Sequence, residues 1–398
     1  MSFTKIAITG YKNYEAETFH FNRRIVGICG LNGMGKTNLL DAINYLCFTK
    51  SYFSKTDALN IFFGAEGFRL EAELQAAEKN KKASKIVCIY RSSSKKEFYL
   101  DDVSYTKFSH HIGKFPCVMI APDDIHVITG GSEERRKFLD TLISQVDAEY
   151  LQQLIIYNKV LQQRNAFLKN ESFQNSFDTQ LLETLDAQLI KPAKYIHRMR
   201  MQFCSKLIPL IQQFYDNISG NNEKVNLEYT SHLNHADMAT LLKESKQKDI
   251  ITQRTNTGIH KDDLVFLLED NIFKNTASQG QRKSLLFACK LAEFQILFEA
   301  KGSPPLLLLD DVFEKLDELR MKNLLEYVCK KNSGQVFITD THRGRLENAL
   351  EEFWDEVQII ELTDYCFYFY NQVVPFATYI FIFIVCLKFQ LVRHCSSS

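Results

Sequence analysis

A glycine-rich loop that ends in lysine and threonine lies near the start of this 398-residue chain. The loop and the residue after it are Gly30, Leu31, Asn32, Gly33, Met34, Gly35, Lys36, Thr37 and Asn38. The first eight fit G-x-x-x-x-G-K-T, follow an apolar strand and open a helix, as in a P-loop whose backbone N–H groups cradle phosphates. The pattern predicts that Lys36 reaches the terminal phosphates of ATP and that Thr37 binds magnesium (Mg²⁺).

Two carboxylates, Asp310 and Asp311, directly follow a run of four leucines. Such a run predicts a buried parallel strand, which would deliver both side chains to the sheet edge where α/β proteins bind their ligands. We therefore expect Asp310 to be the protein's other magnesium ligand. Asp311 is the candidate catalytic residue, placed to orient or deprotonate the attacking water. The alternative is a pair of solvated turn residues.

A second small-residue segment, with Ser278, Gly280 and Gln281, precedes a helix that begins near Arg282. By itself this segment is typical of a capped helix start. Its position ahead of the leucine strand makes it a candidate for a further nucleotide contact.

Basic side chains without any acid occupy residues 191–206. We expect four of them to lie on outer faces of a helix and to contact DNA phosphates: Lys191, Lys194, Arg198 and Arg200. A merely solvated helix face is the alternative. Because 48 basic residues balance 48 acidic ones, DNA binding would have to come from such local patches.

Strand and helix patterns place these motifs in an α/β protein divided into segments. Residues 1–125 read as the first half of an α/β unit, the half with the P-loop, and residues 251–363 read as its second half. Between them, residues 126–250 have helical periodicity, with two long apolar stripes and a linker at residues 170–177. The pattern predicts an antiparallel helical arm inserted into this unit.

Composition restricts the class of protein further. Hydrophobic residues make up 45% and charged residues 24% of the chain, which is typical of folded soluble proteins. The ten cysteines form no C-x-x-C pair, so they read as reduced core residues. The start of the chain has no apolar signal segment, and the expected location is the cytoplasm.

The tail, residues 364–398, departs from this composition. Residues 365–387 contain no charge but are rich in Phe and Tyr and include a proline. A misread or aberrant terminus is the favoured interpretation, with a packed terminal strand and a membrane anchor as alternatives. Membrane association is not expected.

Several separated strings together resemble the RecF family of SMC-like ABC ATPases: GLNGMGKTNLLDAI, APDDIHVITGGSEERRKFLD, YNKVLQQRNAFLK, GIHKDDLVF, ASQGQRKS, LLLLDDVFEKLD and QVFITDT. The resemblance implies an ABC-type P-loop ATPase head split by an inserted antiparallel helical arm. It also implies that Ser278 and Gly280 act in trans on the ATP held by Lys36 of a second copy, with Gln281 as a further nucleotide contact, which makes an ATP-dependent homodimer.

The same resemblance implies an ATP-dependent DNA-binding protein of recombinational repair and replication-fork maintenance. Such a protein acts at junctions of double-stranded and single-stranded DNA, helps to load recombinase, uses ATP hydrolysis as a switch, and has RecR and RecO as partners. An SMC-like structural chromosome ATPase would predict a longer arm. A transporter nucleotide-binding subunit would predict an LSGGQ-like signature.

The resemblance places three further features near the nucleotide. Asp317 would lie in a loop between the two sites, residues 122–124 in a sensing loop, and Lys12 at a phosphate contact. The position of the switch residue stays open among Thr339, Asp340 and His342.

Overall fold

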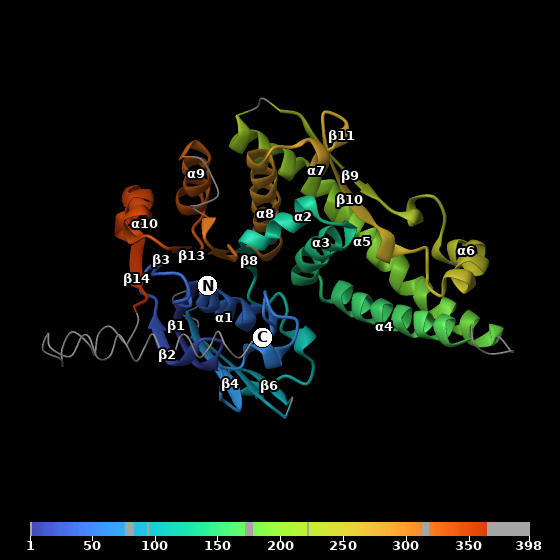
Figure 1. Cartoon of the computed structure of the whole chain (residues 1–398), viewed down its shortest axis with the longest axis horizontal. Helices are drawn as coiled ribbons and strands as arrows, with labels where there is room; N and C mark the ends of the chain where they lie inside the picture. The colour runs from blue at the N-terminus through green and yellow to red at the C-terminus, as the bar shows by residue number, and fades with distance from the viewer. Residues whose placement is uncertain are drawn as a thin grey trace, which may run out of the picture.

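The computed structural model describes residues 2–75, 83–93, 95–171, 178–220, 223–312 and 318–363. It consists of a head, built on two sheets, and a helical arm that extends to one side (Figure 1). The predictions for Asp317 and for the tail from residue 364 lie outside the described residues.

One sheet of the head is antiparallel, with the strand order β2-β1-β4-β5-β6-β7. Its strands are β1 (Ser2–Tyr11), β2 (Tyr14–His20), β4 (Gly67–Gln75), β5 (Ser84–Arg91), β6 (Lys96–Leu100) and β7 (Val103–Ser104). Alternate residues of β4, such as Leu70 and Leu74, are buried, whereas their neighbours are exposed or partly exposed. This period of two gives the sheet one apolar face, which packs on the rest of the head.

The second sheet is parallel, with the order β14-β3-β13-β12-β8. Its strands are β3 (Ile25–Cys29), β8 (Cys117–Ile120), β12 (Leu306–Leu309), β13 (Val336–Asp340) and β14 (Val357–Glu361). Every residue of the three inner strands, β3, β13 and β12, and of the edge strand β8 is buried. This is expected for a parallel sheet that is covered on both faces. Both halves of the chain contribute strands, so the split α/β head that the sequence predicts is confirmed.

Helices surround these sheets and form the arm. They are α1 (Lys36–Phe48), α2 (His126–Thr129), α3 (Ser132–Val146), α4 (Ala148–Glu171), α5 (Thr179–Ser219), α6 (Met238–Thr252), α7 (Phe273–Thr276), α8 (Gln279–Lys301), α9 (Glu318–Leu325), followed by a π-helical segment (Glu326–Lys331), and α10 (Arg343–Leu350). Short 3-10 turns lie at Asp57–Asn60, Phe108–His110, Pro122–Ile125, His232–Asn234, Ile259–Lys261 and Glu351–Glu356. None of the helices in the described ranges is both long enough and apolar enough to cross a membrane.

The arm is built on α4 and α5, which run side by side away from the head (Figure 1). This arrangement confirms the predicted helical hairpin. A small third sheet, β11-β10-β9, lies along α5 and comprises β9 (Val225–Thr230), β10 (Asp263–Leu268) and β11 (Asn271–Ile272). Strand β9 falls within residues 126–250, which the sequence assigned to helices alone.

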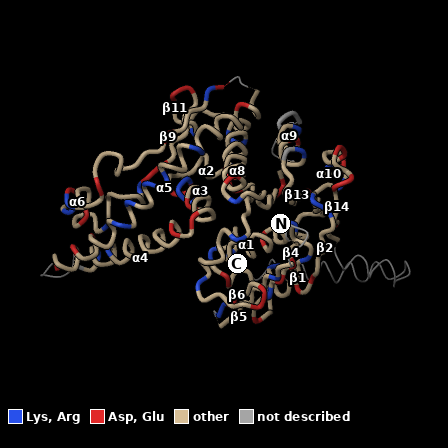
Figure 2. The backbone as a smooth tube through the Cα atoms, turned by 180° about the vertical axis from the view of Figure 1, so that it is seen from behind, with Lys and Arg blue, Asp and Glu red and all other residues tan. Residues whose placement is uncertain are grey.

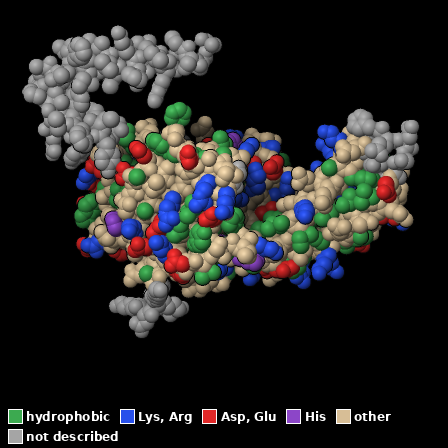
Figure 3. Space-filling model, turned by 90° about the horizontal axis from the view of Figure 1, so that it is seen from below, with side chains coloured by type: hydrophobic (Ala, Val, Ile, Leu, Met, Phe, Trp, Pro, Cys, Tyr) green, Lys and Arg blue, Asp and Glu red, His purple; other side chains and the backbone are tan. Residues whose placement is uncertain are grey.

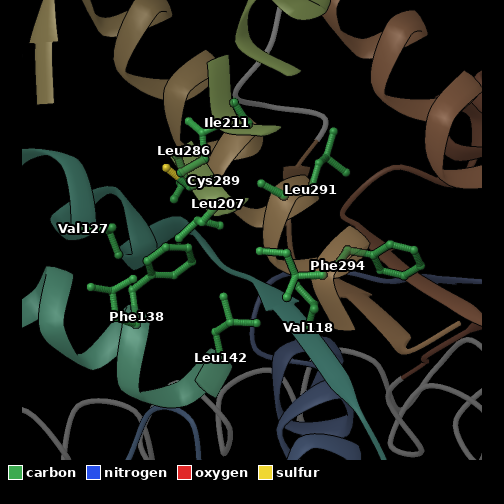
Figure 4. Packing of buried hydrophobic residues seen from close by; sticks show 14 of the residues in the cluster. Val118, Val127, Phe138, Leu142, Leu207, Ile211, Leu286, Cys289, Leu291 and Phe294 are labelled. Carbon is green, nitrogen blue, oxygen red and sulfur yellow. The ribbon is translucent and has the colours of Figure 1, made fainter. Parts of the chain in front are cut away.

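The arm and head share one hydrophobic core. Leu207 and Ile211 of α5 lie close to Leu286 and Cys289 of α8, and Phe138 of α3 joins them (Figure 4). A second cluster fills the space between α1 and the antiparallel sheet. Because α8 starts at the small-residue segment around Ser278, the arm is packed directly on an element of the candidate site.

Candidate nucleotide-binding site

The glycine-rich loop lies between β3 and α1, at the carboxyl edge of the parallel sheet. Gly33 has φ +88°, and a Cβ there would meet no atom within 4 Å, so its backbone borders open space. Gly35 has φ +102°, and a Cβ there would lie 2.7 Å from both the Asn13 amide nitrogen and the Tyr14 hydroxyl. These two glycines allow the backbone conformation and close approach that a phosphate-binding loop requires.

The turn between β1 and β2 supports the loop from one side. Tyr14 donates its hydroxyl hydrogen to the Gly35 carbonyl at 3.0 Å, and the Asn38 side chain donates to Asn13 Oδ1 at 2.7 Å. Sequence reasoning missed Asn13 and Tyr14. Their contacts depend on how the first sheet packs on the second, and no local spacing signals that packing.

Lys36 is buried at the start of α1, and its ammonium group lies over the loop. Nζ donates to the carbonyl oxygens of Gly30 at 2.8 Å and Leu31 at 3.1 Å. Leu31, Asn32 and Gly33 are exposed at the loop tip, whereas Met34 is half-buried. The positive charge is therefore held against the loop backbone.

Thr37 and Asp310 meet across the two halves of the head. The Thr37 hydroxyl lies 3.0 Å from Asp310 Oδ1 and 2.9 Å from Oδ2. Burial raises the pKa of Asp310 above its ordinary value, although hydrogen bonds from Thr339 and Thr37 oppose this shift. The sequence predicted that these two residues act together, and the structure brings them into contact.

Asp311 follows in a left-handed backbone conformation, with φ +46°. That region is costly for a residue with a Cβ, so surrounding contacts must hold it. One such contact is the hydrogen bond from the Asp311 N–H to Thr339 Oγ1 at 2.9 Å.

The segment around Ser278 caps α8. Ser278 Oγ accepts from the Gln281 N–H at 3.2 Å, and Gln281 Oε1 accepts from the Ser278 N–H at 2.6 Å. This reciprocal pair is a capping box, which orders the first turn of a helix. In the described parts of the chain, no hydrogen bond joins Ser278, Gly280 or Gln281 to the glycine-rich loop.

The donor set at Thr37 and Asp310 fits a magnesium ion. Mg²⁺ prefers hard oxygen ligands, and in nucleotide sites the protein typically supplies few of them while phosphates and water supply the rest. A hydroxyl and a buried carboxylate in mutual contact match that pattern. Among the described residues there is no cluster of three or more His, Cys, Asp or Glu that could hold a metal without a nucleotide.

Lys12 and Asp124 are held in ion pairs. Lys12 Nζ lies 2.6 Å from Asp41 Oδ2, and Asp41 also accepts from the Tyr52 N–H. Asp124, in the predicted sensing loop, lies 3.5 Å from Lys290 Nζ on α8 and accepts from the Tyr52 hydroxyl. Tyr52 thus connects the segment that follows α1 with α8.

The predicted DNA-contacting residues separate into two groups. Lys191, Lys194 and Arg198 are exposed on α5, and their spacing of three and four places them on one helix face. Lysines and arginines also gather in the middle of the face seen in Figure 3. Over the molecule as a whole, basic and acidic residues are interspersed (Figure 2), in line with the net charge of zero.

Arg200 does not lie on an outer face, and its prediction as a DNA contact is wrong. It is 1% exposed. Its guanidinium lies 2.8 Å from Asp140 Oδ1 and 2.7 Å from Asp262 Oδ2 and donates to the Ile259 carbonyl. Arg200 is two residues beyond Arg198, which corresponds to more than half a helical turn, so the two side chains point in opposite directions.

With this geometry established, comparison with known proteins identifies the family. The model of the RecF/RecN/SMC N-terminal domain family matches residues 2–358. The DNA replication and repair protein RecF of Flavobacterium johnsoniae is 42% identical over 362 residues, which cover 91% of this chain and 100% of the relative. The chain belongs to the RecF family. Another RecF, from Bacteroides thetaiotaomicron, is 41% identical and covers 91% of this chain and 97% of the relative.

Solved structures agree with membership of the RecF family. A structure of the recombination mediator protein RecF-ATPrS in the RecFOR pathway matches with a TM-score of 0.80 and 28% identity, covering 91% of this chain and 96% of that one. A RecF-ATP structure matches with a TM-score of 0.79 and 30% identity, covering 86% and 92%. An Smc head bound to a ScpA domain has a TM-score of 0.53 at 13% identity, covers 90% of this chain and 94% of that one, and shows that the fold is shared.

Proposed function

We propose that this chain is a DNA replication and repair protein that works as an ATP-dependent, DNA-binding molecular switch. The contact between Thr37 and Asp310 carries the proposal, because it joins the phosphate-binding loop to the leucine strand across the inserted arm. The names of the RecF relatives, and of the RecF-ATP structure among them, support the same function.

In this proposal ATP lies on the loop from Gly30 to Asn38, and Lys36 binds its terminal phosphates. Thr37 and Asp310 would hold Mg²⁺, which supplies charge neutralisation at those phosphates when bound. Asp311 is the proposed catalytic residue and orients or deprotonates the attacking water. Hydrolysis is proposed to be slow and to reset the switch.

The segment with Ser278, Gly280 and Gln281 is proposed to contact the ATP of a second copy. Its hydrogen bonds within its own chain are local, and its helix N-terminus suits a phosphate because the N–H groups of the first turn point outward. ATP would then hold an otherwise weak homodimer together.

DNA is the proposed macromolecular ligand, at junctions of double-stranded and single-stranded segments. The exposed face of Lys191, Lys194 and Arg198 on α5 would contact phosphates without reading bases. RecR and RecO are the proposed protein partners, and the name of the related structure in the RecFOR pathway supports this assignment.

The test is the mass of the full chain, measured by analytical ultracentrifugation with ATP, with ADP or without nucleotide, each with and without junction DNA. We expect dimers with ATP alone, and a further shift with DNA. Lys36→Ala should remain folded and monomeric, because the ammonium group that it loses binds phosphate. A wild-type chain that stays monomeric with ATP, or dimerises equally without it, would contradict the proposal.

A further inference from the structure

The Thr339 hydroxyl contacts the Asp310 carboxylate and the Asp311 backbone at the edge of the parallel sheet. It donates to Asp310 Oδ1 at 2.8 Å and accepts from the Asp311 N–H at 2.9 Å. Thr339 is fully buried in β13, one residue beyond the point where Ile338 pairs with Leu309 of β12. The register of the two strands therefore sets Thr339 beside Asp310.

Each of these two hydrogen bonds has a separate consequence. Asp310 is buried, so its orientation is fixed by its few donors, which include the hydroxyls of Thr37 and Thr339. Asp311 has a left-handed backbone, and the bond from its N–H to Thr339 helps to hold that conformation. One side chain thus contacts the Asp310 carboxylate directly and supports the backbone that carries the Asp311 side chain.

Two other residues are candidates for the switch position, Asp340 and His342. Asp340 makes its hydrogen bonds to α10, and His342 is exposed to solvent. Asp340 accepts from the Arg345 guanidinium at 2.8 and 2.9 Å and from the His342 N–H, so its carboxylate is tied to α10. His342 is exposed at the start of that helix. Thr339, by contrast, donates a hydrogen bond to the Asp310 carboxylate and accepts one from the Asp311 N–H.

We propose that Thr339 is a positioning residue for ATP hydrolysis: its hydroxyl orients Asp310 toward magnesium and holds the backbone turn that places Asp311. The inference rests on the proposed function. Thr339 contacts the Asp310 carboxylate and the Asp311 backbone, and it acts through these two residues. Removing a group that hydrogen-bonds to a metal ligand typically lowers metal affinity or activity by about 10-fold to 100-fold.

The decisive substitution is Thr339→Val, which keeps the shape of the side chain and removes both hydrogen bonds. Thr339→Ser keeps the hydroxyl. Ile338→Val, in the same strand, is the matched control, because it trims a buried side chain without touching a polar group. The melting temperatures of all three variants show how far each substitution destabilises the protein.

The measurements are binding of a fluorescent ATP analogue over a range of Mg²⁺ concentrations, and kcat and KM for ATP at saturating Mg²⁺. For Thr339→Val we expect unchanged analogue binding without Mg²⁺. We also expect a roughly 10-fold higher Mg²⁺ requirement and a kcat lowered about 10-fold or more, with KM within about twofold. Thr339→Ser and Ile338→Val should stay within about threefold of the wild type.

Two results would overturn the inference. One is a folded Thr339→Val with the wild-type Mg²⁺ requirement and kcat, and the other is a Thr339→Ser as impaired as Thr339→Val. If the valine variant aggregates, Thr339→Ala, which also lacks the hydroxyl, is compared with Thr339→Ser on the same criteria. A wild-type chain that neither binds nor hydrolyses ATP would instead refute the proposed function.

Discussion

Two arginines on α5 show how strongly the surroundings decide the role of a side chain. Arg198 is exposed, and its guanidinium lies over the Tyr195 ring, 4.9 Å from the centroid. Arg200 is fully buried between Asp140 and Asp262. Removing one partner from a buried ion pair is costly, because the guanidinium and the Asp262 carboxylate are both shielded from water.

We therefore predict that Arg200→Met lowers the free energy of unfolding by about 3–5 kcal/mol, since Asp262 stays buried without its cation. Arg198→Met is the matched control and should change it by less than about 1 kcal/mol. Urea unfolding followed by circular dichroism measures both changes. Arg198→Met should also weaken junction-DNA binding. Wild-type stability of Arg200→Met would contradict the prediction.

Arg200 also shows what a sequence reveals about a single residue. It lies four positions after Ile196 and three before Phe203, both in the apolar stripe that the sequence displays, so its burial could have been recognised. Its partners could not, because Asp140 and Asp262 come from α3 and from the turn before β10. Contacts of this kind depend on tertiary packing, which no local pattern records.

At the scale of elements, α8 carries a buried charged cluster: Lys290 and Glu293 on the helix, Asp124 from the turn after β8, and Tyr52 from the segment after α1. Burial is the main cause that raises the pKa of Glu293 to about 7, with Lys290 opposing the shift. The folded chain therefore retains a proton on Glu293 in a pH range where the unfolded chain has lost it.

This shift predicts the pH dependence of stability. From the ordinary pKa of 4.5 up to about 7, unfolding releases a proton, so rising pH favours the unfolded chain until the folded group has also titrated. Glu293→Gln cannot titrate. Its melting temperature relative to the wild type should therefore be several degrees higher at pH 8 than at pH 5.5.

The control for this measurement is Glu299→Gln, which alters an exposed carboxylate on the same helix. The difference in melting temperature between Glu299→Gln and the wild type should be the same at pH 5.5 and pH 8. If the melting temperature of Glu293→Gln relative to the wild type is also the same at pH 5.5 and pH 8, Glu293 has no raised pKa and the prediction is wrong.

Elements with a local signature were predictable and elements without one were not. The glycine-rich loop, the leucine strand and the helical hairpin are each specified by neighbouring residues. Strand β9 has six residues between two helical segments, and it becomes a strand by pairing with β10 across α6. The contact of Thr339 with Asp310 likewise depends on the register of β12 and β13, which only the folded sheet defines.

For the whole molecule, the proposed homodimer predicts complementation between two inactive chains. Lys36→Ala removes the phosphate-binding cation, and Ser278→Arg places a bulky cation where the ATP of the second copy would approach. In a mixed dimer one site carries both defects and the other carries neither. With random pairing about half of the dimers are mixed, so roughly a quarter of the wild-type ATPase rate should return.

ATPase assays on mixtures of the two purified variants measure this recovery. The control uses a double variant that carries both Lys36→Ala and Ser278→Arg in one chain. When it is mixed with either single variant, no intact site can form. No recovery in mixtures that contain demonstrable mixed dimers would exclude independent sites in trans. Wild-type turnover per chain that does not depend on concentration would exclude them as well.

The place of β3 in the parallel sheet also governs when the molecule can be assembled during synthesis. Ile25 of β3 pairs with Val336 of β13 on one side and Val357 of β14 on the other. Strand β3, which leads into the glycine-rich loop, therefore has no neighbour in its sheet until β13 and β14 have been synthesised. Such distant pairings fold slowly and expose strand edges meanwhile. We therefore expect the nascent chain to be prone to aggregation until β14 has emerged.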